Sequence, residues 1–409
     1  MNLKTLKGET YKNRLLIDHL RSLTGIRAEC NKLLLLATQQ QLLHFTYHPE
    51  NMRSVVDFVL QTMRNNYPTL DIPYHSRWRH FEAGGIDRIK ILNNTCTGLE
   101  QAMRNVELVI ISVLLDAGAG VAWRYMDHLS NTTLSKSEGL AVASFNLFMQ
   151  DFFADASSLQ NMTAQDLADG LQVSDKNPLV GLNGRVAVLQ ALGTAIENKT
   201  EYFADKTGPM RLGNIVKYWL RHAVNSNLSM SIIFTSLLES LSQVLIGKFF
   251  IDAVSLGDVW PHSLCVSEFN PQGLVPLHKL TQWLCYSLIE PLQNIGLTIT
   301  DIDLLTGLPE YRNGGLFVDF KVLTPKDANM INIQHSLGSE FVLEWRAMTV
   351  ALLDVLAENI RAKLDVTAEQ LPLSKILQGG TWAAGRAIAA QLRVDAGPPF
   401  KLDSDGTLF

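Results

Sequence analysis

A run of polar and aromatic residues at positions 73–85 contains side-chain types that are able to bind a small anion and to take part in acid–base chemistry. It reads PYHSRWRHFEAGG and follows neither helical nor strand periodicity, which indicates a loop of the kind on which sites are built. Arg77 and Arg79 present rigid paired donors for a carboxylate or phosphate, and His75 is a candidate acid or base. Two aromatic candidates for substrate contact are Tyr74 and Trp78. The structural alternative is that the arginines cap helices while the rings fill the core.

A second segment, GDVWPHS at 257–263, places a carboxylate, an indole and an imidazole in one turn, where Pro261 restricts the backbone. Asp258 and His262 are candidate catalytic groups, and Trp260 is a candidate substrate contact. The structural alternative is an aspartate that caps the turn and a tryptophan that fills the core.

A third segment, LTGLPEYRNGGLFVD at 305–319, supplies two carboxylates, Glu310 and Asp319, for acid–base catalysis. Its paired glycines would let the backbone approach a ligand closely. Three residues between the carboxylates are candidate substrate contacts: Tyr311, Arg312 and Asn313. The structural alternative is an ion pair between Glu310 and Arg312 at a turn.

A fourth segment, GGTW at 379–382, is expected to open a helix that carries Arg386. Unpaired N–H groups at a helix start attract anions, although a plain loop with a threonine cap would contain the same residues.

The composition and the missing motifs exclude several classes of protein. A net charge of -5 argues against a general polyanion binder, so we expect no nucleic-acid partner. The GxGxxG, Walker A, HExxH and GxSxG motifs are absent, which disfavours Rossmann dehydrogenases, NTPases, zincins and α/β-hydrolases. The four cysteines lie far apart and form no cluster with histidine, so no metal or cofactor is expected.

The elements that must position these loops are mainly helices. Apolar residues recur at helical spacing around 55–63, 135–148, 276–291 and 338–363. Strand patterns are limited to 297–302 and 316–322. Because no interdomain linker or internal repeat interrupts the chain, we expect one large, mainly α unit over 1–409 with a few short strands. Two lobes, about 1–130 and 131–409, are an option.

The expected location is the cytoplasm, because the N-terminus lacks the apolar core and cleavage site of a secretory signal. The apolar runs at 108–115 and 229–238 are shorter than the ~20 residues of a spanning helix, so no membrane contact is expected. The sequence leaves the oligomeric state open, with a homodimer as one option.

Five blocks resemble a family found in uracil-catabolism gene clusters of fungi and bacteria, long labelled a domain of unknown function. They are the 73–85 run, GLNGR at 181–185, GDVWPHS at 257–263, PEYRNGGLFVD at 309–319 and GGTWAAGR at 379–386. The clusters imply that uracil becomes its ribonucleotide, that a cyclohydrolase-like enzyme opens the ring, and that a ribosyl-urea intermediate is then degraded. The resemblance makes this chain a candidate for that last step.

A second similarity concerns DLLTGLPEYR at 303–312, which resembles the LT-x-x-x-D-Y-R block of queuosine-salvage nucleosidases. Those are helical proteins related in fold to DNA glycosylases, and the acidic residue of their block is catalytic. The similarity implies a DNA-glycosylase-like fold and places Glu310 at the position of that acid.

The two resemblances together imply an N-ribosyl hydrolase that releases urea from a ribosyl-urea, with or without a 5′-phosphate. Breaking an N-ribosyl bond develops positive charge on the sugar, while the departing nitrogen needs a proton. Glu310 is expected to face the anomeric carbon. Asp258 or Asp319 would share that task, His75 or His262 would serve the leaving group, and Arg77, Arg79 and Arg312 would hold a phosphate. Two alternatives stay open: an amidohydrolase acting on the ureido group, and a non-catalytic pathway protein that binds a nucleotide or partner enzyme.

Overall fold

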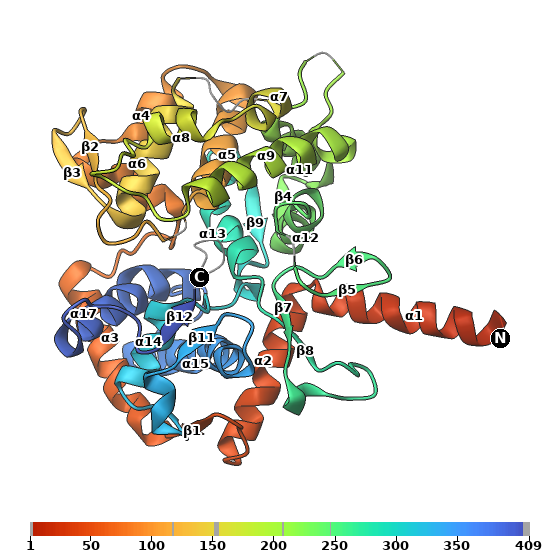
Figure 1. Cartoon of the computed structure of the whole chain (residues 1–409), viewed down its shortest axis with the longest axis vertical. Helices are drawn as coiled ribbons and strands as arrows, with labels where there is room; N and C mark the ends of the chain where they lie inside the picture. The colour runs from red at the N-terminus through yellow and green to blue at the C-terminus, as the bar shows by residue number, and fades with distance from the viewer. Residues whose placement is uncertain (1–2, 117, 151–154, 207, 246, 404–409) are drawn as a thin grey trace. The chain divides into compact units, whose positions relative to one another are not determined.

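The computed structural model describes residues 3–116, 118–150, 155–206, 208–245 and 247–403. Helices dominate this part of the chain (Figure 1), which confirms the expectation of a mainly α fold. The α-helices are α1 (Leu3–Leu20), α2 (Leu23–Thr38), α3 (Met52–Asn66), α4 (Arg88–Asn93), α5 (Gly98–Leu114), α6 (Lys136–Phe148), α7 (Ala156–Gln160), α8 (Ala164–Gly170), α9 (Leu182–Asn198), α10 (Thr200–Phe203), α11 (Ile215–His222), α12 (Met230–Ser240), α13 (Lys279–Gln293), α14 (Tyr311–Asp319), α15 (Glu340–Leu364), α16 (Leu373–Ile376) and α17 (Trp382–Leu392).

The strands are short, and each described strand pairs with a single partner. Antiparallel pairs join β1 (Phe45–Tyr47) to β10 (Leu323–Pro325), β2 (Tyr125–Asp127) to β3 (Thr132–Leu134), β5 (Phe250–Ile251) to β6 (Val254–Ser255), and β7 (Val259–Pro261) to β8 (Leu274–Pro276). Parallel pairs join β4 (Asn227–Ser229) to β9 (Thr298–Thr300) and β11 (Gln334–Ser336) to β12 (Lys401–Asp403). Short helical turns are η1 (Pro49–Asn51), η2 (Arg77–Gly85), η3 (Leu212–Asn214), η4 (Ser263–Cys265), η5 (Ile302–Leu304), η6 (Ala328–Ile331) and the π-helix η7 (Leu377–Thr381).

Most predicted elements are present. The helical pattern at 55–63 lies in α3, that at 135–148 in α6 and that at 338–363 in α15, whose N-cap Ser339 accepts a hydrogen bond from the backbone N–H of Val342. The helix expected from Pro276 begins later, at Lys279, and continues past Pro291. The strand predicted at 297–302 is β9, whereas the one predicted at 316–322 is wrong, because residues 311–319 form α14. Partial alternation over so few residues does not separate a strand from a short buried helix.

The described residues form two compact units, each built from separate stretches of the chain. Unit 1 comprises the described parts of Met1–His75, Ile246–Gln282 and Asp303–Ser404, and unit 2 those of Ser76–Leu245 and Trp283–Ile302. These bounds differ from the lobes expected at about 1–130 and 131–409. The 73–85 run divides between the units after His75.

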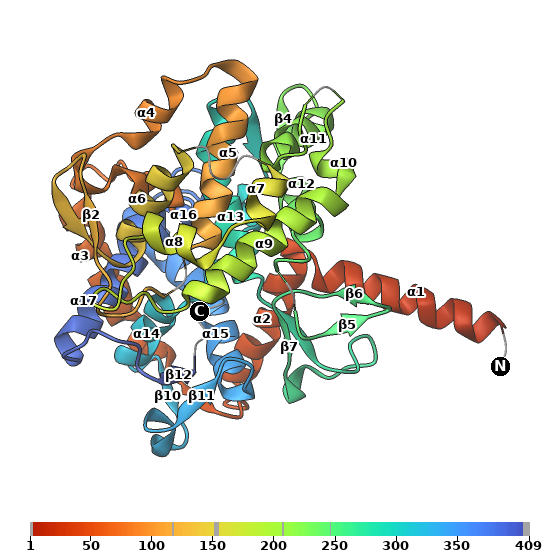
Figure 2. The ribbon, with the colours of Figure 1, turned by 45° about the horizontal axis from the view of Figure 1, so that its top comes forward.

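In unit 1, α15 forms the centre, and its residues are buried almost continuously from Phe341 to Leu353. Helices α2 and α14 pack against it, and α17 packs against α14 (Figures 1 and 2). Gly314 explains how closely α14 approaches: its carbonyl accepts a hydrogen bond from Trp345 Nε1 at 3.0 Å, and a Cβ at this position would lie 2.8 Å from that nitrogen. Gly314 was expected to let the backbone approach a ligand, but its missing side chain makes room for Trp345.

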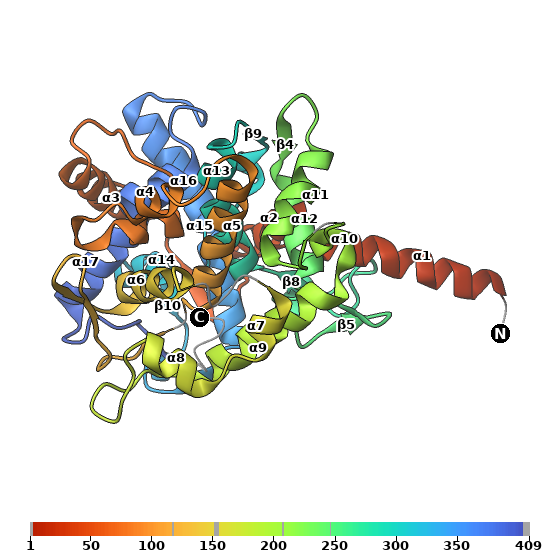
Figure 3. The same ribbon diagram turned by 90° about the horizontal axis from the view of Figure 1, so that it is seen from above.

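In unit 2, α5 is buried from Val106 to Leu114, and residues 108–114 of the apolar run lie in its second half. Helices α6 and α9 pack against α5, and α7 packs on α9 (Figure 3). The run is thus a core segment, as its length predicted. Among the described residues, no helix combines the length and apolar character needed to cross a membrane.

Candidate active site around Trp382

Glu310 is the N-cap residue of α14. Its Oε2 accepts the backbone N–H of Arg312 at 2.9 Å, and its Oε1 accepts that of Asn313 at 2.7 Å. A negative charge is favourable there because the first N–H groups of a helix have no partner within it. Glu310 was expected to form an ion pair with the Arg312 side chain, but it binds the backbone N–H of Arg312 instead. The guanidinium of Arg312 is not used in this contact.

The guanidinium of Arg312 lies over the indole of Trp382, with Cζ 4.4 Å from the ring centroid. It also lies 5.4 Å from the ring centroid of Tyr311. A second arginine, Arg386, lies one helical turn after Trp382 on α17 and places its Cζ 5.1 Å from the same indole. Aromatic faces attract cations, and the indole of Trp382 contacts one guanidinium from α14 and one from α17.

Gly385 allows α17 to lie directly against the start of α14. A Cβ at this position would meet the carbonyl oxygen of Arg312 at 2.3 Å, far inside van der Waals contact. The absence of a side chain at Gly385 thus lets Trp382 reach Arg312.

His75 lies beside Trp382, with ring centroids 6.3 Å apart. Its Nδ1 bonds to Gln378 Oε1 at 2.9 Å, while Gln378 Nε2 donates to Tyr67 Oη at 3.4 Å. Since the amide of Gln378 presents its oxygen to the ring, Nδ1 carries the hydrogen and Nε2 is the basic nitrogen. Burial lowers the pKa of His75 to about 4; the Gln378 hydrogen bond opposes this change and the charge of Arg312 adds to it. His75 is therefore neutral at pH 7.

Gln378 belongs to the π-helix η7, which connects α16 directly to α17. The expectation that Gly379 and Gly380 open a helix is wrong, because both lie inside this continuous helical segment. A Cβ on Gly379 would meet Ile72 and one on Gly380 would meet Val59, each at 2.6 Å, so both glycines serve packing. Such π turns occur frequently at functional sites.

Both carboxylate oxygens of Asp258 accept hydrogen bonds from other residues of unit 1. Arg346 donates to both carboxylate oxygens, at 3.0 and 2.8 Å, and Trp260 Nε1 donates to Oδ1 at 2.7 Å. The backbone N–H of Lys279 donates to Oδ2 at 3.1 Å. Burial opposes ionisation, yet Arg346 and the Trp260 hydrogen bond hold the pKa of Asp258 well below its ordinary value. These contacts fix the turn to α15 and fit the structural alternative for both Asp258 and Trp260.

His262 is fully buried and belongs to a different cluster, also on α15. Its Nδ1 accepts the backbone N–H of Leu264 at 3.2 Å, so Nε2 donates to Glu344 Oε2, also at 3.2 Å. The Glu344 carboxylate in turn accepts three backbone N–H groups that precede or begin β1, those of Leu43, His44 and Phe45. This network joins three segments of unit 1.

Asp319 and Asn313 have structural contacts as well. Asp319 forms a two-fold ion pair with Arg393, with both hydrogen bonds at 2.7 Å. It is the last residue of α14, and a helix of this length separates it from Tyr311 by about 12 Å along the axis. Asn313 is buried and donates to the carbonyl of Leu308 at 3.1 Å. Glu310 and Asp319 thus occupy opposite ends of one helix.

The predicted arginines of unit 2 are paired with carboxylates. Arg77 is fully buried, with an ion pair to Asp116 at 3.0 Å and a hydrogen bond to Ser112 Oγ at 2.8 Å. Arg79 pairs with Glu82 at 2.7 Å and Glu290 at 2.5 Å. Trp78 is buried and meets Phe81 edge-on. Only Tyr74 and His75 of the 73–85 candidates belong to the same unit as Glu310.

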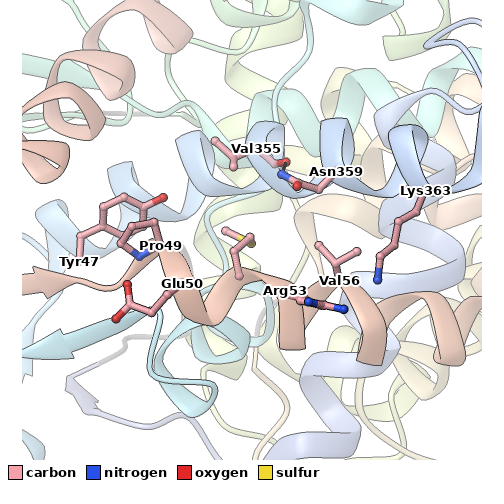
Figure 4. A pocket seen from close by; sticks show the side chains of 9 residues that line it. Tyr47, Pro49, Glu50, Arg53, Val56, Val355, Asn359 and Lys363 are labelled. Carbon is pink, nitrogen blue, oxygen red and sulfur yellow. Dashed lines mark hydrogen bonds between the residues drawn. The ribbon is translucent and has the colours of Figure 1, made fainter.

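An open hollow of about 560 Å³ lies between α3 and α15 in unit 1 (Figure 4). Its lining includes Tyr47, Arg53, Asn359 and Lys363, and Lys363 pairs with Asp57. None of the predicted catalytic residues lines it. Within the described part of the chain, no group of three or more His, Cys, Asp or Glu residues is placed to hold a metal ion.

Sequence reasoning missed Gln378 and Tyr67. Gln378 is 303 positions from His75, and no pattern in the chain links the two. The signal nearest to Gln378 is the glycine pair that follows it, and that pair predicts a helix start rather than a partner for His75.

Comparison with known proteins places the chain in a family. A family model described as "Protein of unknown function (DUF1688)" matches residues 19–409. Uracil catabolism protein 4 of Lachancea kluyveri is 36% identical over 410 residues, which cover 90% of this chain and 92% of that protein. Protein urg3 of Schizosaccharomyces pombe is 36% identical over 419 residues, covering 96% of this chain and 99% of the relative. The resemblance found in the sequence blocks is confirmed, and the chain belongs to the DUF1688 family.

Proposed function

We propose that this protein acts in uracil catabolism as an N-ribosyl hydrolase, which cleaves the bond between ribose and the nitrogen of a ribosyl-urea. The name of the Lachancea kluyveri relative supports the pathway, because the two chains are 36% identical over most of their lengths. The reaction is supported by His75 and Arg312, which both lie beside Trp382, and by Glu310, which caps the helix that carries Arg312; these contacts carry the proposal.

The carboxylate of Glu310 would stabilise the oxocarbenium-like sugar. Each of its oxygens accepts one backbone N–H, and a carboxylate oxygen has more than one acceptor position, so capacity remains for a substrate. The two cap bonds also fix its orientation. Such preorganised charge is a large contribution to catalysis, because no reorganisation is needed as positive charge develops.

His75 would act as a base, which changes the role expected from the sequence. A histidine with a pKa of about 4 carries almost no proton to donate at pH 7. Its Nε2 would take a proton from the attacking water as the C1′–O bond forms and the C1′–N bond breaks. The imidazolium produced would then return that proton to the departing nitrogen, so that one water is consumed and urea and ribose are released.

The test is to incubate the full-length protein with ribosyl-urea, with and without a 5′-phosphate, and to measure urea and the free sugar. We expect urea and sugar in equal amounts. Ammonia in place of urea would indicate hydrolysis of the ureido group and overturn the proposal, as would absence of turnover at high enzyme concentration.

A matched pair of variants tests the role of Glu310. Glu310→Gln keeps an oxygen that caps α14 but removes the charge, so turnover should fall at least about 100-fold while the fold persists. Asp319→Asn, at the other end of the same helix, should retain turnover close to that of the parent. A rate for Glu310→Gln within a few-fold of the parent would remove Glu310 from the catalytic role.

A further inference from the structure

We propose that the hollow between α3 and α15 (Figure 4) is a binding site for a small organic anion, whose carboxylate or phosphate group binds the guanidinium of Arg53. This inference goes beyond the proposed function, because none of the residues assigned to catalysis lines the hollow. All of the lining residues belong to unit 1.

The size and lining of the hollow suit a small molecule. Its volume of about 560 Å³ lies within the range of about 300–1,000 Å³ that is typical of ligand pockets. The apolar lining residues are Pro49, Met52, Val56 and Val355, and the polar ones are Tyr47, Glu50, Arg53, Asn359 and Lys363. Its exposed wall is mainly apolar with a few polar groups around it, which is the usual composition of a ligand site.

Residue spacing on two helices builds this wall. Met52 and Val56 are one turn apart on α3, so their side chains share a face of that helix. Val355, Asn359 and Lys363 follow one another in steps of four on α15 and share a face in the same way. Each helix therefore presents one stripe of side chains to the hollow.

The charges of the lining residues differ in whether they are paired. Lys363 forms an ion pair with Asp57. Glu50 lies 3.4 Å from Nδ1 of His48. Arg53 makes no hydrogen bond or ion pair with a residue that the structure describes. The hydrogen bond and charge of Lys363 lower the pKa of Asp57, and the charge of Arg53 adds a smaller effect, so Arg53 is near this carboxylate without pairing with it.

The position of Arg53 sets which end of the hollow would bind the anion. Figure 4 shows its guanidinium at the end toward which Lys363 also points, whereas Tyr47 and Glu50 lie at the other end. A guanidinium presents paired N–H donors in one plane, and these match two oxygens of a carboxylate or phosphate. An anion bound to Arg53 would thus lie at the end away from the Glu50 carboxylate.

The body of the ligand would lie on the apolar wall between the two ends. Two neutral polar groups are available to it, because neither the hydroxyl of Tyr47 nor the amide oxygen of Asn359 has a hydrogen-bond partner among the described residues. Hydroxyl or amide groups on the body could bind there. The ligand class is therefore a small anion with an apolar surface and one or two neutral polar groups.

The experiment observes the methyl group of Met52 by NMR in the full-length protein labelled at its methionine methyl groups. Met52 lines the hollow, and Met52→Leu assigns its signal among the eleven methionines. The probes are benzoate, phenyl phosphate and neutral benzamide, which share an aromatic ring that shifts a nearby methyl signal. We expect at least one anion to shift the Met52 signal saturably and to bind at least about tenfold more tightly than benzamide, with the advantage reduced at high salt. The tighter anion identifies carboxylate or phosphate as the preferred group.

Arg53→Gln should weaken binding of the anion by at least about tenfold and leave binding of benzamide unchanged. Arg53 is exposed, so its variant should fold normally, and unchanged signals of the other methionines would verify this. Arg64→Gln is the matched control, because Arg64 is an exposed arginine of the same helix that does not line the hollow. It should bind both anions as the parent does. A Met52 signal that neither anion moves, equal affinities for the anions and benzamide, or equal losses in the two arginine variants would overturn the site.

Discussion

At neutral pH the imidazole of His75 should carry no charge, and this can be measured directly. The perturbation is a pH titration from 8 to 3. Burial lowers the pKa of His75 to about 4, against the smaller opposing effect of the Gln378 hydrogen bond. An unperturbed histidine titrates near 6.5, so the gap corresponds to roughly 3 kcal/mol of free energy that disfavours the charged ring in the folded protein.

The stability of the protein should depend on pH because the folded and unfolded states bind the His75 proton over different pH ranges. Between pH 6.5 and about 4 the unfolded chain protonates His75 whereas the folded protein does not. The folded state therefore loses stability as the pH falls through this range, and the contribution is fully present above pH 6.5. His75→Gln should remove this part of the pH dependence, because glutamine does not titrate.

The assay is NMR of the protein labelled at histidine, with His75→Gln used to assign the resonance among the ten histidines. We expect the His75 signal to show a neutral ring with its hydrogen on Nδ1 and to titrate near pH 4. Gln378→Glu should raise that pKa, because a carboxylate beside Nδ1 favours the charged ring. A midpoint at or above 6.5 in the parent protein would refute both the neutral ring and the base role assigned to His75.

Three further predictions concern structural contacts within unit 1. Glu310→Ala should cost about 1 kcal/mol of unfolding free energy through loss of the α14 cap, while Glu310→Asp should cost less; equal urea midpoints for Ala and parent would contradict the capping role. Arg346→Met should destabilise the protein by about 3–5 kcal/mol because it leaves Asp258 buried and unpaired, and a change under 1 kcal/mol in thermal or urea unfolding would show that this pair is not structural. Gly385→Ala should lower the free energy of unfolding by about 1–3 kcal/mol, because its methyl group must push α17 away from the Arg312 carbonyl; an unchanged urea midpoint would argue against the close packing.

The sequence by itself determined the helical character of the fold, because helices are encoded locally. The apolar spacing of α3 and α15 repeats every three or four residues, so both helices could be predicted without tertiary contacts. The cap that Glu310 makes on α14 is equally local, but the sequence pattern predicted an ion pair with the Arg312 side chain and a strand at 316–322 in its place.

The tertiary structure decided which of the candidate groups are committed to structure, because their partners come from distant parts of the chain. Asp258 meets Arg346 across 88 positions, and His262 meets Glu344 across 82. His75 finds Gln378 across 303 positions, and that contact sets its tautomer while burial sets its pKa. Residue type and spacing specify what a side chain can do, whereas its charge state and its available hydrogen bonds depend on neighbours that only folding brings near.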